Sequence, residues 1–136
     1  MNSNSLLIVI IVVLVAAGGF YFIRSASAAD KPGGYTDPAA LAKLVAEKTE
    51  PYVLVDVRTP EEYAAGHIPG AVNIPYDTIA GNPPAKDKNA LVIVYCRSGN
   101  RSSIAKRTLD AQGFTRVEDF GAVGRWKGEL VTGSKP

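Results

Sequence analysis

The position of the charged residues divides this chain into two parts that cannot share one fold. The 136 residues include 15 Lys and Arg and 13 Asp and Glu, yet the first charged side chain is Arg24. The uncharged part contains an apolar run, residues 6–23, which as a helix is about 27 Å long, close to the hydrocarbon thickness of a bilayer. A helix that is apolar on every side needs a membrane or a large core around it. We therefore expect residues 1–24 to be a transmembrane anchor or a signal peptide.

Two interpretations of this segment stay open. Its length favours a retained anchor, because the apolar core of a signal peptide is usually shorter. Ala26-Ser27-Ala28 is an A-x-A cleavage pattern and favours a secretory signal, although residues 1–5 contain no Lys or Arg. We expect a membrane-associated or exported domain on the periplasmic or extracytoplasmic side. The alternative is an inner-membrane anchor with a cytosolic domain, which Arg24 and Lys31 weakly favour by the positive-inside rule.

The rest of the chain predicts a linker and one domain. Residues 25–35 are small, polar and contain Gly and Pro, as linkers do. Residues 36–133 are enough for one modest core, and residues 134–136 form a tail. The net charge of +2 is too small and too dispersed for a nucleic-acid-binding surface. Because the chain has one Cys and one His, it offers no internal disulfide and no Cys-rich zinc site.

Strand and helix patterns alternate along the domain. Asp37 and Pro38 open a helix, and Thr59, Pro60 and Glu62 form a capping box that opens a short second helix ending at Gly66. Strand patterns lie at residues 52–57, 71–74, 91–95 and 116–120, and further helical patterns at residues 102–112 and 124–130. This order predicts an α/β fold, with a mostly parallel sheet covered by helices on both faces.

The candidate chemistry follows the strongest strand pattern. Cys96 comes directly after LVIVY and opens the segment Cys96–Arg101 (CRSGNR). In an open α/β sheet ligands bind at the carboxyl ends of strands, where the next helix points its free N–H groups and positive dipole end. These groups stabilise a thiolate, so we expect the pKa of Cys96 to lie below that of a free thiol. A small buried hydrophobe is the alternative for a lone Cys, and the S-G-N-R context favours a nucleophile.

The other residues of this loop are expected to bind an anion. Gly99 permits a tight turn, and Ser98 and Asn100 contribute backbone N–H groups to an anion nest. Arg97 and Arg101 add positive charge for substrate binding, with Arg101 the better candidate. Such a site suits a small dianion with a transferable sulfur, which a thiolate takes and passes on by double displacement. This chemistry needs no metal ion and no cofactor.

Three segments of the chain resemble the rhodanese homology domain, in the same order and spacing. They are residues 55–75 (VDVRTPEEYAAGHIPGAVNIP), 94–102 (VYCRSGNRS) and 121–130 (GAVGRWKGEL). The resemblance covers about residues 35–133 and implies a rhodanese-like fold with a five-stranded, mostly parallel sheet, here preceded by one N-terminal hydrophobic helix. It also implies that Cys96 is the nucleophile, that Cys96–Arg101 is the active-site loop, and that Asp56 and Arg58 support this loop.

The resemblance further implies a thiosulfate sulfurtransferase that works through a persulfide on Cys96. The C-x4-R loop resembles the sulfurtransferase branch, whereas the phosphatase and arsenate-reducing relatives have C-x5-R, a longer ring that encloses a tetrahedral oxyanion. The expected partners are a small anionic sulfur donor, a thiol or cyanide acceptor, and the membrane through residues 6–23. Nucleic acid is not expected, and the protein is expected to be a monomer. The alternatives are a delivery module that loads sulfur but turns over poorly, and phosphatase or arsenate reductase chemistry.

Several other conspicuous residues are expected to have structural roles. We interpret His67 as a hydrogen-bonding residue rather than a base, and Glu61 and Glu62 as charges in the first turn of a helix. Asp56 and Arg58 are scaffold charges that hold the loop, and Trp126 is an anchor in the core.

Overall fold

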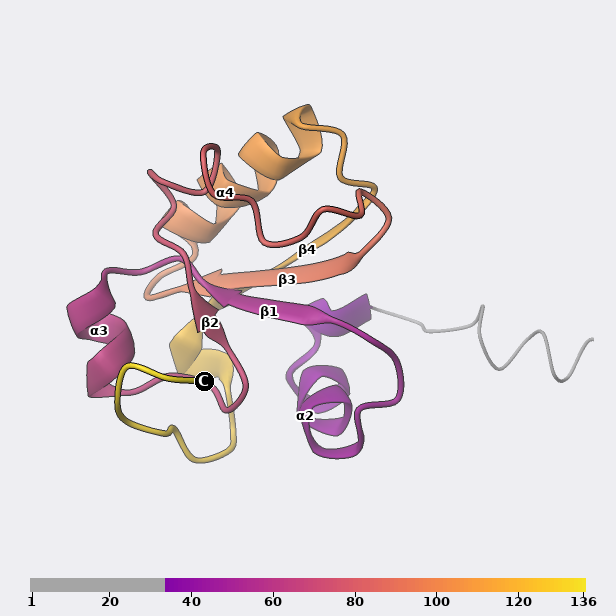
Figure 1. Cartoon of the computed structure of the whole chain (residues 1–136). Coiled ribbons are helices and arrows are strands. Elements are labelled where there is room, and N and C mark those ends of the chain that lie inside the picture. The colour runs from indigo at the N-terminus through magenta and orange to yellow at the C-terminus, as the bar shows by residue number, and fades with distance from the viewer. Residues whose placement is uncertain (1–33) are drawn as a thin grey trace, which may run out of the picture. The chain divides into compact units, whose positions relative to one another are not determined.

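The computed structural model describes residues 34–136 (Figure 1). The anchor or signal segment, the N-terminal hydrophobic helix and residues 25–33 of the expected linker lie outside the described residues. Among residues 34–136 no helix combines the length and the apolarity needed to cross a bilayer.

The centre of the domain is a parallel sheet of four strands. These are β1 (Val53–Asp56), β2 (Val72–Asn73), β3 (Leu91–Cys96) and β4 (Arg116–Ala122), in the order β2-β1-β3-β4. The expected parallel sheet is confirmed, but the expectation of five strands is wrong for the described part of the chain. Residues 34–136 contain four strand patterns, and besides the four strands this part of the chain forms one isolated antiparallel bridge, between His67 and Val131.

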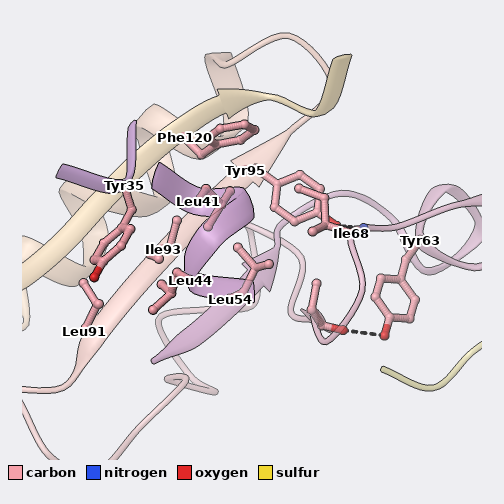
Figure 2. Close-up of a cluster of buried hydrophobic side chains, with 11 residues drawn as sticks. Tyr35, Leu41, Leu44, Leu54, Tyr63, Ile68, Leu91, Ile93, Tyr95 and Phe120 are labelled. Atoms are coloured by element: carbon pink, nitrogen blue, oxygen red, sulfur yellow. Dashed lines mark hydrogen bonds between the residues drawn. The ribbon is translucent and has the colours of Figure 1, made fainter. Parts of the chain in front are cut away.

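Helices cover both faces of the sheet, as expected (Figure 1). On one face α2 (Pro38–Glu47) and α3 (Pro60–Ala65) lie over a core that contains Leu41 and Leu44. On the other face α4 (Asn100–Ala111) buries Ala105 and Leu109 against the second core. Figure 2 shows the first of these cores, in which Tyr95 and Phe120 pack beside the leucines of α2.

The predicted helix starts at Asp37 and Thr59 are confirmed. The Asp37 carboxylate accepts the Ala40 N–H at 2.9 Å. Thr59 and Glu62 form the reciprocal capping box, with Thr59 Oγ1 accepting the Glu62 N–H and the Glu62 carboxylate accepting the Thr59 N–H. These local signals need only neighbouring residues, which is why the sequence predicts them correctly.

Two helix predictions need correction. The fourth helix begins at Asn100 rather than at residue 102, so Asn100 and Arg101 belong to its first turn. The closing helix expected at residues 124–130 is absent, and the segment contains a 3-10 turn, η2 (Val123–Arg125), followed by extended chain. Its glycines disfavour a helix, and the Trp126 ring lies where a Cβ on Gly128 would meet it at 2.9 Å.

The N-terminal boundary of the domain also differs from the expectation. Tyr35, which the sequence assigns to the linker, lies in the 3-10 turn η1 (Gly34–Thr36) and is only 3% exposed. Its N–H bonds to the Glu118 carboxylate and its hydroxyl donates to Glu50 at 2.6 Å. The turn therefore packs as part of the domain.

Candidate active site

Cys96 is the last residue of β3 and lies at the carboxyl edge of the sheet. It is fully buried, and α4 begins four residues later at Asn100. Strand β3 is buried along its whole length and lies between β1 and β4. Because the strand ends on the thiol, the sheet fixes the position of its sulfur.

The turn after Cys96 wraps backbone donors around the sulfur. Gly99 has φ 97°, in the left-handed region where a residue without a Cβ is favoured. This conformation brings the Gly99 N–H to 3.0 Å from the Cys96 Sγ. Sγ also lies 3.5 Å from the hydroxyl of Ser102, in the first turn of α4, and this hydroxyl donates to the Gly99 carbonyl at 3.1 Å.

These contacts change the ionisation of the thiol. Burial raises the pKa of Cys96, but the hydrogen bond between Sγ and the Ser102 hydroxyl and those from the N–H groups of Ser102, Gly99 and Ser98 together lower it by more, so the net pKa is below its ordinary value. The helix dipole acts in the same direction. The site therefore stabilises a buried thiolate, which is the nucleophilic form of the residue.

The two arginines of the loop have different surroundings. Arg97 is exposed, and within residues 34–136 it forms no ion pair. Arg101 forms a bidentate pair with Glu62 on α3, at 2.7 Å and 2.9 Å. The loop therefore carries one cation that is open to solvent and one that a carboxylate already holds.

Asp56 and Arg58 lie beside the active strand. They form a buried ion pair at 2.7 Å, and Arg58 also donates to the Gly66 carbonyl at 2.6 Å. The guanidinium lies 5.8 Å from the centre of the Tyr95 ring, one residue before the nucleophile. The Tyr95 hydroxyl accepts the Ile68 N–H at 3.0 Å (Figure 2). The pair thus braces the end of β3, and among residues 34–136 no hydrogen bond or ion pair joins it to the sulfur.

His67 lies in a different environment from the nucleophile. Its ring is fully buried, stacks on Tyr63 with centroids 3.7 Å apart, and bonds through Nδ1 to the Tyr63 carbonyl at 2.9 Å. Its backbone forms both hydrogen bonds of the bridge to Val131. Through its ring His67 contacts α3, and through its backbone it contacts the C-terminal segment.

Sequence reasoning missed two residues of this site. The helical pattern puts Ser102 at the start of a helix and gives it no role, yet its hydroxyl faces the sulfur because α4 begins two residues earlier than expected. The sequence indicates only a first-turn charge for Glu62, whereas its contact with Arg101 joins residues 39 positions apart. A serine near the start of the helix that follows a nucleophile could have indicated the contact between Ser102 and the sulfur. No local pattern predicts the contact between Glu62 and Arg101.

No set of three His, Cys, Asp or Glu side chains in residues 34–136 is grouped closely enough to hold a metal ion. The expectation that the reaction needs no metal ion and no cofactor stays a prediction.

Comparisons with known proteins agree with this geometry. The rhodanese-like domain family matches residues 37–122. Thiosulfate sulfurtransferase PspE of Escherichia coli is 44% identical over 73 residues, 51% of this chain and 68% of that protein. A sulfurtransferase of Allochromatium vinosum is 42% identical over 81 residues, 60% of this chain and 75% of that protein. The solved structure of an E. coli rhodanese with anions has a TM-score of 0.53 and 40% identity, and covers 60% of this chain and 99% of its own. The chain therefore belongs to the rhodanese-like domain family and is a sulfurtransferase of the rhodanese type.

Proposed function

We propose that this protein takes a sulfane sulfur from thiosulfate or a similar small anion and passes it to a thiol or cyanide through a persulfide on Cys96. One observation carries this proposal: a buried sulfur at a strand end, with the Gly99 N–H at 3.0 Å and the first turn of a helix beside it. That arrangement holds a thiolate ready without a general base. It also offers N–H groups to a second negative charge.

In the first step the Cys96 thiolate attacks the outer sulfur of thiosulfate. A new S–S bond forms at Cys96, the S–S bond of the donor breaks, and sulfite leaves with the electron pair. The product is a persulfide anion, Cys96–S–S⁻. We propose that the loop residues Arg97, Ser98, Gly99 and Asn100 bind the donor, three of them through backbone N–H groups and Arg97 through its exposed charge.

In the second step a thiophilic acceptor attacks the terminal sulfur. With cyanide, a C–S bond forms, the persulfide S–S bond breaks and thiocyanate leaves, so the Cys96 thiolate is restored. The same N–H groups that stabilise the thiolate make it a good leaving group here. This double displacement requires no oxidant and no reductant.

The loop length supports sulfur chemistry over phosphate or arsenate chemistry. Six residues from Cys96 to Arg101 form a tight ring, and the last of them is tied to Glu62. A small ring has room for one extra sulfur atom rather than for a tetrahedral oxyanion. Hydrolysis of an aryl phosphate by the purified protein would contradict this choice.

Intact-mass spectrometry of the full chain tests the persulfide. After thiosulfate treatment we expect one added sulfur, about 32 Da, which cyanide then removes with release of thiocyanate. Steady-state turnover separates an enzyme from a delivery module, because a module loads the sulfur but hardly cycles. A chain that gains no sulfur would contradict the proposed function.

We also propose that residues 1–24 act as a membrane anchor or a signal peptide, that residues 25–33 are the linker, and that the domain works as a monomer on the extracytoplasmic side. The absence of charge before Arg24 and the Ala26-Ser27-Ala28 pattern support this placement. Membrane fractionation with protease protection tests the side, and the mass of the native protein tests cleavage. A full-length, soluble, cytosolic protein would contradict the proposal.

A further inference from the structure

One ion pair joins the loop that carries the nucleophile to a helix on the other face of the sheet. Glu62 lies in the first turn of α3, and Arg101 lies in the first turn of α4. Two hydrogen bonds, Arg101 Nη1 to Glu62 Oε2 at 2.7 Å and Arg101 Nη2 to Glu62 Oε1 at 2.9 Å, connect the guanidinium to the carboxylate. A fork of this kind fixes direction as well as distance.

The carboxylate of Glu62 is itself held in place. The oxygen that accepts Arg101 Nη1 also accepts the Thr59 N–H at 3.0 Å. Both contacts affect the pKa of Glu62. The hydrogen bonds from Arg101 lower this pKa most, burial raises it, and the hydrogen bonds with Thr59 lower it further, to about 2. The carboxylate is therefore charged at any physiological pH and points toward α4 from a capped helix end.

Stability alone does not account for this arrangement. The two side chains are 25% and 28% exposed, and ion pairs this open to solvent contribute little to folding. What the pair does is fix the first turn of α4, and this turn carries Ser102 and follows the Gly99 N–H that bonds to the sulfur. A shift of about 1 Å in such groups can reduce a rate by about a hundredfold.

We infer that Glu62 is a positioning residue of the sulfur-transfer site and that Arg101, which it holds, positions the loop rather than binding the donor. The exposed Arg97 is then the loop cation that remains for the donor anion. This assignment rests on the proposed function, and it differs from the expectation that Arg101 is the better donor-binding residue.

A double-mutant cycle tests this inference. The variants are Glu62→Gln, Arg101→Gln and the double variant, with Glu61→Gln as a matched control, because Glu61 is an exposed neighbour in the same helical turn. Gln at position 62 keeps the capping box, since its amide oxygen still accepts the Thr59 N–H. We expect both single variants and the double variant to lose about tenfold in kcat, with the KM for thiosulfate unchanged within about twofold. The control is expected to match the wild type.

The rate of Cys96 alkylation by iodoacetamide across pH gives a readout that does not depend on transfer activity. The double variant leaves the net charge near the loop unchanged, so charge effects of the single variants cancel in it. We expect alkylation at pH 7 to slow in all three variants, because the N–H groups no longer converge on the sulfur. Opposite changes in the single variants, with a double variant that matches the wild type, would show a charge effect only and overturn the inference.

Two kinetic results would also overturn it. If Arg101→Gln raises the KM for thiosulfate tenfold or more and Glu62→Gln does not, Arg101 binds the donor. If Glu62→Gln lowers only the melting temperature, the pair is merely structural. Should the wild type fail to turn over thiosulfate, the proposed function fails, but the alkylation cycle still decides the role of the pair.

Discussion

Helices α3 and α4 begin at the same edge of the sheet. They differ in which groups accept the free backbone N–H groups of their first turns. Asp56 at the end of β1 pairs with Tyr95, the residue before Cys96, so both helices follow adjacent parallel strands. Helix α3 begins with a complete capping box and Pro60, which has no N–H to satisfy. Helix α4 has Gly99 at its N-cap, which has no side chain to offer, and the Gly99 N–H points to the sulfur instead.

This difference shows what the site requires. A helix start leaves four N–H groups without partners, and a side-chain cap satisfies them for stability. At the start of α4 the N–H groups of Gly99 and Ser102 meet a buried thiol and lower its pKa, with the Ser102 hydroxyl contributing most among the hydrogen bonds. Helix α3 is the capped counterpart, and its carboxylate at Glu62 braces the uncapped helix. Changes at each helix start should therefore have different consequences.

The largest effect is expected when the sulfur itself is replaced. Cys96→Ser keeps the size and burial of the side chain but places a poorly acidic hydroxyl above the helix start. We expect no thiocyanate above background and no mass gain with thiosulfate, while circular dichroism remains that of the wild type. If the folded serine variant still transfers sulfur, the N-terminus of α4 is not the reactive site.

The next effect concerns the residue that leaves α4 uncapped. Gly99→Ala forces an L side chain into φ 97°, at a cost of about 1–2 kcal/mol. Its Cβ would meet Gly121 at 3.7 Å, an ordinary contact, so the backbone bears the cost. Because relaxation of this turn removes the N–H from the sulfur, we expect kcat to fall about tenfold or more, with a melting temperature lowered by a few degrees.

Gly113→Ala is the matched control for this substitution. Gly113 has φ 90° just after the other end of α4, and nothing lies within 4 Å of its added Cβ. The same backbone strain should lower the melting temperature similarly and leave sulfur transfer unchanged. Equal loss of activity in the two variants would mean that stability, rather than the loop geometry, limits the reaction.

The sequence predicts local features of both helix starts and misses what joins them. The capping box at Thr59, the buried strand before Cys96 and the turn at Gly99 depend on residues within a few positions, and all are found. The helical pattern puts the start of α4 two residues too late, because Asn100 and Arg101 have no helical pattern of their own. The Arg101–Glu62 contact and the irregular, non-helical course of residues 126–131 depend on packing between distant segments, which periodicity does not encode.

A smaller effect is expected from the hydroxyl that faces the sulfur. Ser102→Ala removes a hydrogen bond that lowers the Cys96 pKa, so this pKa should rise. Since only the thiolate reacts, half-maximal alkylation and transfer should move to higher pH, and the rate on the acidic side should fall about tenfold. The rate well above the new pKa should approach that of the wild type.

Ser103→Ala gives the control for the hydroxyl. Ser103 is the next residue of the same turn, and its N–H bonds to the Gly99 carbonyl through the backbone, which the substitution leaves intact. Its pH profile should overlay that of the wild type. A Ser102→Ala profile that also overlays it would show that the backbone N–H groups alone set the ionisation of Cys96.

The smallest effect is expected at the capped helix. Thr59→Ala removes the acceptor of the Glu62 N–H and should lower the free energy of unfolding by about 1 kcal/mol. Asp37→Ala, which removes the cap of α2, should lower it by a similar amount. The two variants differ because α3 carries Glu62, which binds Arg101, whereas among residues 34–136 no hydrogen bond or ion pair joins α2 to the loop. Fraying of α3 loosens the carboxylate that fixes Arg101, so we expect Thr59→Ala to lower kcat about twofold, whereas Asp37→Ala leaves it unchanged. Urea unfolding and steady-state kinetics on the pair measure both quantities. Equal kcat values at equal loss of stability would show that α3 serves the fold alone and has no part in holding the loop.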